Sequence, residues 1–145
     1  MYLLDTNIVS LFDPRRAAET APLVQWMRER EAVLFLSTII IAEIEVGILK
    51  LRREGKDIRA RQLGAFRDGI ITDFKERLLS LDVPIALMLA RLAEEIRPAV
   101  IERNDLIIAA TAKVHGLTVL TRNLRHFEPT GVPAIDPLRD LPKSG

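Results

Sequence analysis

The chain has 145 residues, a length typical of one domain built around a single hydrophobic core. Its 48% of hydrophobic and 28% of charged residues exclude a disordered polyelectrolyte, and its lack of cysteine excludes disulfides, thiolate zinc sites and cysteine nucleophiles. The net charge of +1 is an average over the whole chain, so it indicates no class of partner by itself.

The first residues, Met1 to Asp5, carry no positive charge from a side chain and reach a carboxylate before an apolar run can form. A secretory signal needs both features, so this start does not resemble one. No uncharged apolar run is long enough to span a bilayer. We therefore expect a cytoplasmic protein that does not bind membranes.

Short apolar runs alternate with longer segments of helical period, which predicts an α/β fold with a mainly parallel sheet. We expect strands at 2–5, 32–36, 78–82, 117–121 and 132–135. We expect helices at 7–12, 17–30, 38–54, 57–76, 84–97 and 105–115. The elements form one domain over residues 1–137, and residues 138–145 are expected to be a loosely held tail.

Several residues mark where these helices begin and end. Asp82 is an acidic N-cap with Pro84 in the first turn, whereas Gly55 and Gly116 can end their helices in a left-handed conformation. The helix at 38–54 is apolar on nearly every side, so we expect it to be buried on more than one side.

Glu43 lies in the narrow polar sector of that helix. Its only obvious local partner is Lys50, two turns further along, and an unpaired buried carboxylate costs several kcal/mol, on the order of 3–5. Glu43 is therefore hard to explain as a structural residue. Glu45, one helical step away, belongs to a different face.

The first and fourth predicted strands also end in polar residues, as Asp5-Thr6-Asn7 and Thr121-Arg122-Asn123. In an open parallel sheet, ligands bind beyond the carboxyl ends of the strands. Asp105 opens the helix at 105–115, and together with Asp5 and Glu43 it forms a candidate acidic cluster. As an alternative, Asp5 and Asp105 are ordinary helix caps.

Carboxylates that converge repel each other and are held ionised most readily by a divalent cation. Oxygen ligands without cysteine or a histidine pair favour Mg²⁺ or Mn²⁺ over Zn²⁺. Such an ion can polarise a phosphate and lower the pKa of bound water, which makes phosphodiester hydrolysis the natural chemistry. A receiver or phosphatase domain is disfavoured, because the first strand ends in one aspartate and not in two closely spaced acids.

Four blocks in order resemble the signature of VapC-type (FitB-like) PIN-domain toxins of type II toxin-antitoxin systems. They read LLDTN at 3–7, AEIEVG at 42–47, DLIIAATA at 105–112, and HGLTVLTRN at 115–123 followed by Phe127. The resemblance covers essentially the whole chain. It implies a three-layer α/β/α sandwich and a magnesium- or manganese-dependent endoribonuclease, whose products carry a 5′-phosphate and a 3′-hydroxyl.

By this resemblance, Asp5, Glu43 and Asp105 are the catalytic and metal-binding residues. Thr6, Asn7 and Thr121 would orient the carboxylates, bound waters or phosphate oxygens. Asn123 is a supporting residue at the position where many PIN domains carry a fourth acid, so we expect one tightly held ion. Glu102 could supply the missing charge, although an exposed loop glutamate is the simpler interpretation. His115 and His126, the latter in a predicted loop, are expected to be structural.

The same resemblance implies three partners: an RNA substrate, a cognate VapB-like antitoxin whose C-terminal segment lies near the acidic pocket, and a second copy in a homodimer. Helix 17–30, with Leu23, Val24, Trp26 and Met27, contributes either to an antitoxin groove or only to the core. The alternative function is a degenerate PIN domain that binds RNA or protein without cleavage.

Candidate RNA contacts come from two basic segments. Six basic residues between 50 and 61 stand against two acids, which indicates either a phosphate-facing patch or a solvated helix face. The candidate residues are Arg52, Arg53, Arg122 and Arg125.

Overall fold

A computed structural model describes residues 1–13 and 20–142 of the chain. Five strands form one parallel sheet in the order β3-β2-β1-β4-β5. Their bounds are β1 (Tyr2–Leu4), β2 (Leu34–Ser37), β3 (Leu78–Leu79), β4 (Thr118–Leu120) and β5 (Ala134–Ile135). All five predicted strands are confirmed in order, and each is shorter than, or shifted from, its predicted range.

The predicted helices are confirmed in order, and a further short helix lies at 124–127, where no helix was predicted. They are α1 (Thr6–Val9), α2 (Ala21–Glu29), α3 (Thr38–Arg53), α4 (Asp57–Asp73), α5 (Val83–Glu95), α6 (Arg103–His115) and α7 (Leu124–Phe127). Short 3-10 turns are η1 (Ser10–Phe12), η3 (Glu31–Val33), η4 (Lys75–Arg77) and η5 (Glu128–Thr130). Residues 17–19 of the predicted helix 17–30 and residues 143–145 of the predicted tail lie outside the described residues.

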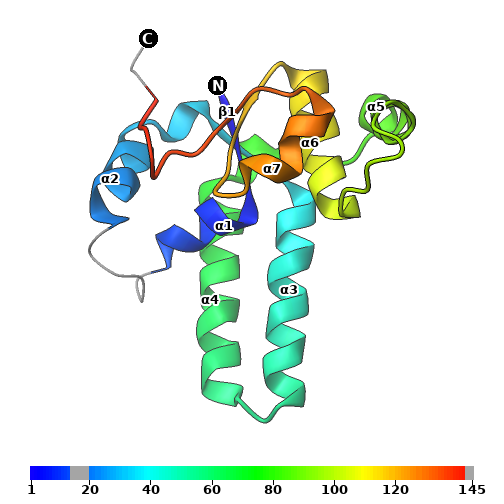
Figure 1. Cartoon of the computed structure of the whole chain (residues 1–145). Coiled ribbons are helices and arrows are strands. Elements are labelled where there is room, and N and C mark those ends of the chain that lie inside the picture. Colours follow the sequence, from blue (N-terminus) through cyan, green and yellow to red (C-terminus); the bar gives the residue numbers. More distant parts are fainter. Residues whose placement is uncertain (14–19, 143–145) are drawn as a thin grey trace.

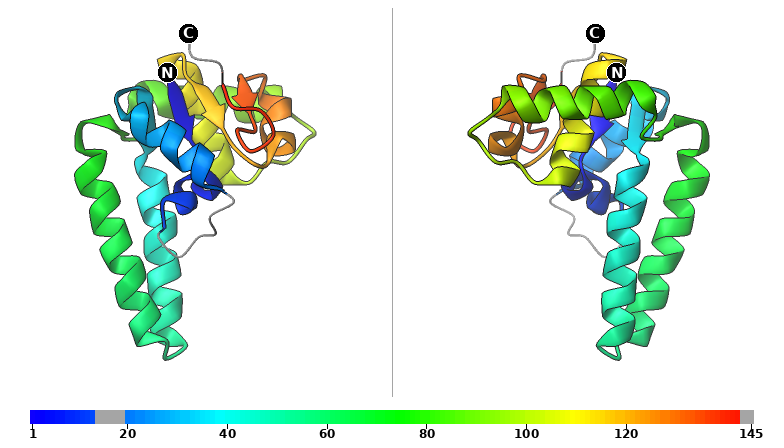
Figure 2. Two further views of the ribbon diagram at one scale, coloured as in Figure 1. Left: turned by 90° about the vertical axis from the view of Figure 1, so that its left-hand side faces the viewer. Right: turned by 90° about the vertical axis from the view of Figure 1, so that its right-hand side faces the viewer.

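Helices cover both faces of the sheet (Figure 2). Successive strand residues enter two different cores, as the side-chain period of a strand requires. Leu4 and Leu120 pack with α1 to α4, whereas Leu3 and Val119 pack on the other face with α5, α6 and α7. This alternation confirms the predicted three-layer α/β/α sandwich.

Helices α3 and α4 form a hairpin that projects from the body of the molecule (Figure 1). The prediction that α3 is buried on more than one side is wrong: Ile44 and Ile48 are buried, but Val46 is 66% and Leu49 is 49% exposed. The reason is that the outer half of α3 packs mainly against α4. Gly55 turns the chain between the two helices with a φ of +75°.

The predicted helix ends are confirmed at two further positions. The Asp82 side chain accepts a 3.1 Å hydrogen bond from the Ile85 backbone N–H and so caps α5. Gly116 ends α6 with a φ of +65°. Within residues 1–13 and 20–142, the helices are too short or too polar for any of them to span a membrane.

Candidate active site

The order in which the strands are added to the sheet reverses between β1 and β4. From β1 the chain builds β2 and β3 towards one edge, and it then returns to place β4 and β5 on the other side of β1. In open α/β sheets, ligands bind at such a switch point, beyond the carboxyl ends of the strands. Asp5 directly follows β1 and Thr121 directly follows β4, and the Asp5 backbone N–H donates a 2.9 Å hydrogen bond to the Leu120 carbonyl.

The Asp5 carboxylate is buried at this point, with 5% of the residue exposed. One oxygen accepts a 2.8 Å hydrogen bond from the Thr6 backbone N–H, and the other accepts one of 2.8 Å from the Thr121 hydroxyl. Burial raises the pKa of Asp5, and these two hydrogen bonds act against that rise. Asp5 therefore caps α1, as the alternative interpretation held, and also belongs to a polar cluster.

Glu43 joins the same cluster from the first half of α3. Its Oε2 accepts a 3.0 Å hydrogen bond from the Thr6 hydroxyl, so Thr6 contacts both acids. Burial is the main cause that raises the pKa of Glu43, and the charges of Asp5, Asp105 and Glu102 raise it further. The cost that the sequence predicts for this half-buried carboxylate is therefore present, and part of it comes from other acids.

Asp105 lies in the first turn of α6, which begins at Arg103, two residues before the predicted start. Its Oδ2 is 2.8 Å from Nδ1 of His126. Its charge also raises the pKa of both Asp5 and Glu43. The three predicted acids thus come from distant segments and act on each other electrostatically.

His126 is the residue whose place in the site was missed from the sequence. It was predicted to be a structural residue in a loop, but it lies in α7, and its imidazole contacts Asp105. No local sequence pattern indicates this contact, because it depends on how α7 packs against α6. A histidine so close to a carboxylate can hold that side chain in one orientation.

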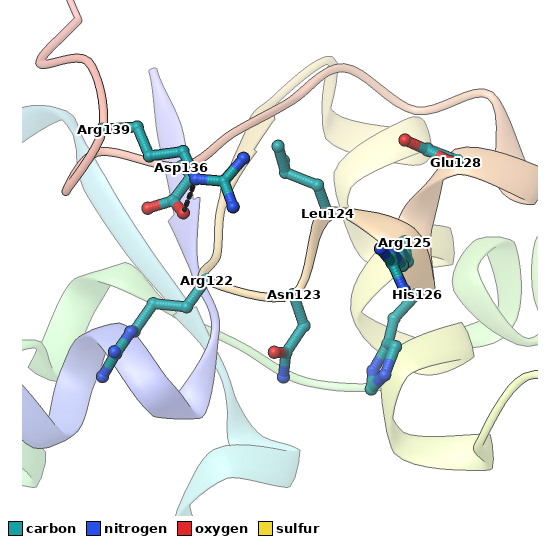
Figure 3. A pocket seen from close by; sticks show the side chains of 8 residues that line it. All are labelled: Arg122, Asn123, Leu124, Arg125, His126, Glu128, Asp136 and Arg139. Carbon is teal, nitrogen blue, oxygen red and sulfur yellow. Dashed lines mark ion pairs between the residues drawn. The ribbon is translucent and has the colours of Figure 1, made fainter.

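The remaining supporting residues are joined by hydrogen bonds. The Asn7 side-chain oxygen accepts a 3.2 Å hydrogen bond from the Arg122 backbone N–H, and the Asn123 backbone N–H donates one of 2.9 Å to the Thr121 hydroxyl oxygen. Figure 3 shows the Asn123 and His126 side chains pointing in the same direction. Glu45 instead pairs with Arg67 of α4, on a different face of α3.

The candidate RNA contacts fall into two places. Arg122 and Arg125 line a cavity beside the site. Arg52 and Arg53 are exposed at the far end of α3, and the helix rise puts them about 15 Å along the helix from Glu43. The structure therefore brings only the first pair to the acidic cluster.

The apolar residues of α2 that were considered for an antitoxin groove belong to the core. Leu23, Trp26 and Met27 are 3%, 8% and 0% exposed, and Val24 packs against the same core from a partly buried position. Core packing is therefore the interpretation that holds for this helix face.

The acidic cluster meets the requirements of a divalent cation only in part. Among the residues that the structure describes, no group of three or more histidine, aspartate or glutamate side chains is arranged to hold a metal ion directly. Mg²⁺ usually keeps several waters and binds through one or two carboxylates, so acids that act on each other without converging fully still fit it. Oxygen donors alone also fit Mg²⁺ or Mn²⁺ better than Zn²⁺.

Comparison with known proteins agrees with this arrangement. A model of the PIN domain family matches residues 2–131. The toxin FitB of Neisseria gonorrhoeae is 33% identical over 144 residues, which cover 97% of this chain and 100% of FitB. A Haemophilus influenzae protein named ribonuclease VapC2 is 30% identical over 131 residues, which cover 88% of this chain and 89% of that protein.

Among solved structures, the crystal structure of FitAcB from N. gonorrhoeae matches with a TM-score of 0.76 and 30% sequence identity. The match covers 94% of this chain and 98% of that chain. The family model and the FitB similarity each span nearly the whole length of the chain. The chain therefore belongs to the PIN-domain family.

Proposed function

We propose that this protein is a metal-dependent endoribonuclease that acts as the toxin of a toxin-antitoxin pair. The observation that carries the proposal is that Asp5, Glu43 and Asp105 gather near the switch point of the sheet, where the charge of Asp105 raises the pKa of both Asp5 and Glu43. The similarity to a protein named as a toxin and to one named as a ribonuclease supports it. RNA is a cytoplasmic substrate, so the toxin would act in the cytoplasm.

Asp5, Glu43 and Asp105 would hold Mg²⁺ or Mn²⁺, with waters completing the coordination shell. A bound divalent cation supplies positive charge that polarises a phosphate. Thr6 and Thr121 hold the carboxylates of Glu43 and Asp5 through their hydroxyl groups. Glu43, whose pKa is raised by burial and by neighbouring acids, is suited to accept the proton of the attacking water.

The partners of this function are RNA, a VapB-like antitoxin and a second copy of the chain. The similarity to a solved toxin-antitoxin complex from Klebsiella pneumoniae, with 26% sequence identity and a TM-score of 0.60, supports the antitoxin. A small cavity of about 120 Å³ near η1 and α4 combines apolar residues, such as Phe12 and Phe66, with charged ones, and offers a mixed surface to such a partner.

The test compares purified wild-type protein with Asp5→Asn, Glu43→Gln and Asp105→Asn on total RNA, with new 5′-phosphate ends mapped by sequencing. We expect wild-type protein to create such ends with Mg²⁺ or Mn²⁺ and each variant to lose activity by about 10²–10⁴-fold. Glu45→Gln is the matched control on the same helix, because Glu45 faces α4 and should leave cleavage unchanged.

Cleavage that survives all three substitutions would remove the acidic cluster from the mechanism. Wild-type protein that binds RNA but creates no new ends with either metal would favour the degenerate PIN domain instead. Thermal melting of every variant separates a loss of chemistry from a loss of folding.

A further inference from the structure

A cavity of about 370 Å³ lies beyond β4 and β5, lined by the side chains drawn in Figure 3. It adjoins the acidic cluster through His126, which contacts Asp105. The loop after β4 and α7 form one wall with Arg122, Asn123, Arg125 and His126, and the segment after β5 adds Asp136 and Arg139. Small-molecule sites in proteins have volumes of roughly 300–1,000 Å³. The cavity, called here the arginine cavity, is therefore large enough for one small ligand, such as a nucleotide.

The charges of its wall favour an anion. Arg139 is paired with Asp136 at 3.4 Å, and Asp136 also accepts a 3.1 Å hydrogen bond from the Leu138 backbone N–H. Asp136 is therefore already neutralised within the wall. Glu128 also lines the cavity, so three arginines against two acids leave a formal net charge of +1. Within residues 1–13 and 20–142, Arg122 and Arg125 form no ion pair, so both guanidinium groups remain available to a ligand.

The arginine cavity adjoins the acidic cluster through two of its own wall residues. His126 contacts Asp105, and the Asn123 backbone N–H binds the same Thr121 hydroxyl that donates to Asp5. A second cavity of about 230 Å³, lined in part by Asp105, shares Arg125 and His126 with the first. Arg125 and His126 thus lie between the two cavities, next to Asp105 of the acidic cluster.

The phosphates of a nucleic acid bound across such a site have two different electrostatic needs. A phosphate at the acidic cluster needs a cation there, and the phosphates before and after it are repelled by the same carboxylates. A guanidinium group can hold a phosphate through two parallel N–H···O hydrogen bonds, so free arginines one step away would offset that repulsion. The basic side chain of a protein partner would be repelled by the same arginines.

We propose that the arginine cavity binds the nucleotide next to the scissile phosphate of a single-stranded RNA, with Arg122 and Arg125 holding its backbone phosphates. The proposal rests on the nuclease function proposed above and names the subsite that positions its substrate. A single strand is specified because a base can enter a cavity only when it is not stacked in a duplex.

The test measures binding of a fluorescein-labelled, mixed-sequence RNA of about ten nucleotides by anisotropy, with Mg²⁺ present and with Glu43→Gln in every protein to suppress cleavage. We expect Arg122→Ala and Arg125→Ala each to weaken binding about tenfold. For single strands, each phosphate contact contributes about −0.7 to the slope of log K against log[salt]. The double variant loses one or two such contacts, so its slope should be less steep than that of wild type by about 0.7–1.4.

The matched control is Arg91→Ala, which removes an exposed arginine of α5 outside the arginine cavity. This variant should bind RNA with an unchanged slope. With Glu43 intact and metal present, the double variant should raise KM and leave kcat nearly unchanged, because the arginines bind substrate and transition state alike. Melting curves establish that all variants are folded.

The possible results separate this proposal from the nuclease function. If the double variant binds and cleaves RNA like wild type, the subsite is wrong and the function stands. If it keeps its RNA affinity but no longer forms a complex with a coexpressed antitoxin, the arginine cavity is a protein-binding site and the proposal is overturned. If folded wild-type protein neither binds nor cleaves RNA, both proposals fall.

Discussion

The hydroxyl of Thr121 donates a 2.8 Å hydrogen bond to the carboxylate of Asp5, although the two residues are 116 positions apart. The bond links the end of β4 to the end of β1 at the switch point of the sheet. It also lowers the pKa of Asp5, against the effect of burial, and so favours the charged form that a metal ligand needs. Thr121 therefore supports both the fold and the acidic cluster.

Thr121→Val should separate these two contributions. The variant keeps the shape of the side chain but leaves a buried carboxylate with one donor fewer, which should cost about 1–3 kcal/mol of unfolding free energy. The pKa of Asp5 should rise further, so the acidic limb of the pH–rate profile should move to higher pH. Thr118→Val, in the same strand, is the control, and an unchanged pH profile in Thr121→Val would refute this role.

Glu43→Gln should stabilise the metal-free protein at neutral pH. Because burial and nearby acids raise the pKa of Glu43 in the folded state, ionising this group opposes folding. That penalty is absent below the pKa of Glu43 in the unfolded chain and grows as the pH rises through the raised folded value. In EDTA, the Tm of the variant should thus be higher than that of wild type at about pH 8, and the difference in Tm should vanish below about pH 4.

Differential scanning fluorimetry across this pH range provides the measurement, and Glu45→Gln is the control. Glu45 faces α4 and pairs with Arg67, so its substitution should not reproduce the pH dependence. A stabilisation of Glu43→Gln that grows towards acidic pH would have the wrong sign and would contradict the argument.

His126→Ala should weaken metal binding without unfolding the protein. The imidazole contacts Asp105 at 2.8 Å, and loss of a group that orients a metal ligand typically lowers affinity by about 10–100-fold. The measurement is the rise of Tm with Mn²⁺ concentration, since a ligand at a hundred times its Kd stabilises the folded state by about 2.7 kcal/mol. His115→Ala, at the other end of α6, should titrate like wild type, and equal titrations of the two variants would exclude a positioning role for His126.

Two glycine substitutions should change stability in opposite directions. Gly116 has a φ of +65° and no atom within 4 Å of an added Cβ, so Gly116→Ala should cost about 1–2 kcal/mol through backbone conformation alone. Gly69 lies inside α4 with the same open space around it, so Gly69→Ala should gain about 0.5–1 kcal/mol. Urea unfolding measures both, and two changes of the same sign would contradict the prediction.

The order of the elements could be predicted from the sequence because hydrophobic periodicity reports directly on burial. The extent to which α3 is buried could not be predicted in the same way. Periodicity identifies the apolar positions, but it does not show whether a neighbouring element covers them. Val46 and Leu49 are exposed on the projecting hairpin, although the pattern around them is that of a buried helix. Strand lengths were overestimated for a related reason, since residues just outside the paired backbone, such as Leu117 and Val132, are buried like those within it.

The candidate site was predicted best where a side chain directly follows a strand or opens a helix. Asp5 and Thr121 lie at strand ends that parallel pairing brings together, so topology alone placed them side by side. Asp105 follows from the start of α6. His126 and the arginine cavity depend on the path of the chain after β4, and no local pattern encodes that path.

Leu3 and Leu4 enter opposite cores of the sandwich, and Asp5 follows them directly. An insertion or deletion of one residue within β1 would therefore move each of these side chains to the opposite face of the sheet and turn the carboxylate away from Thr121. The amino-terminal segment should accept many conservative substitutions but very few insertions or deletions. Residues added ahead of Met1, such as an affinity tag, leave the length of β1 intact.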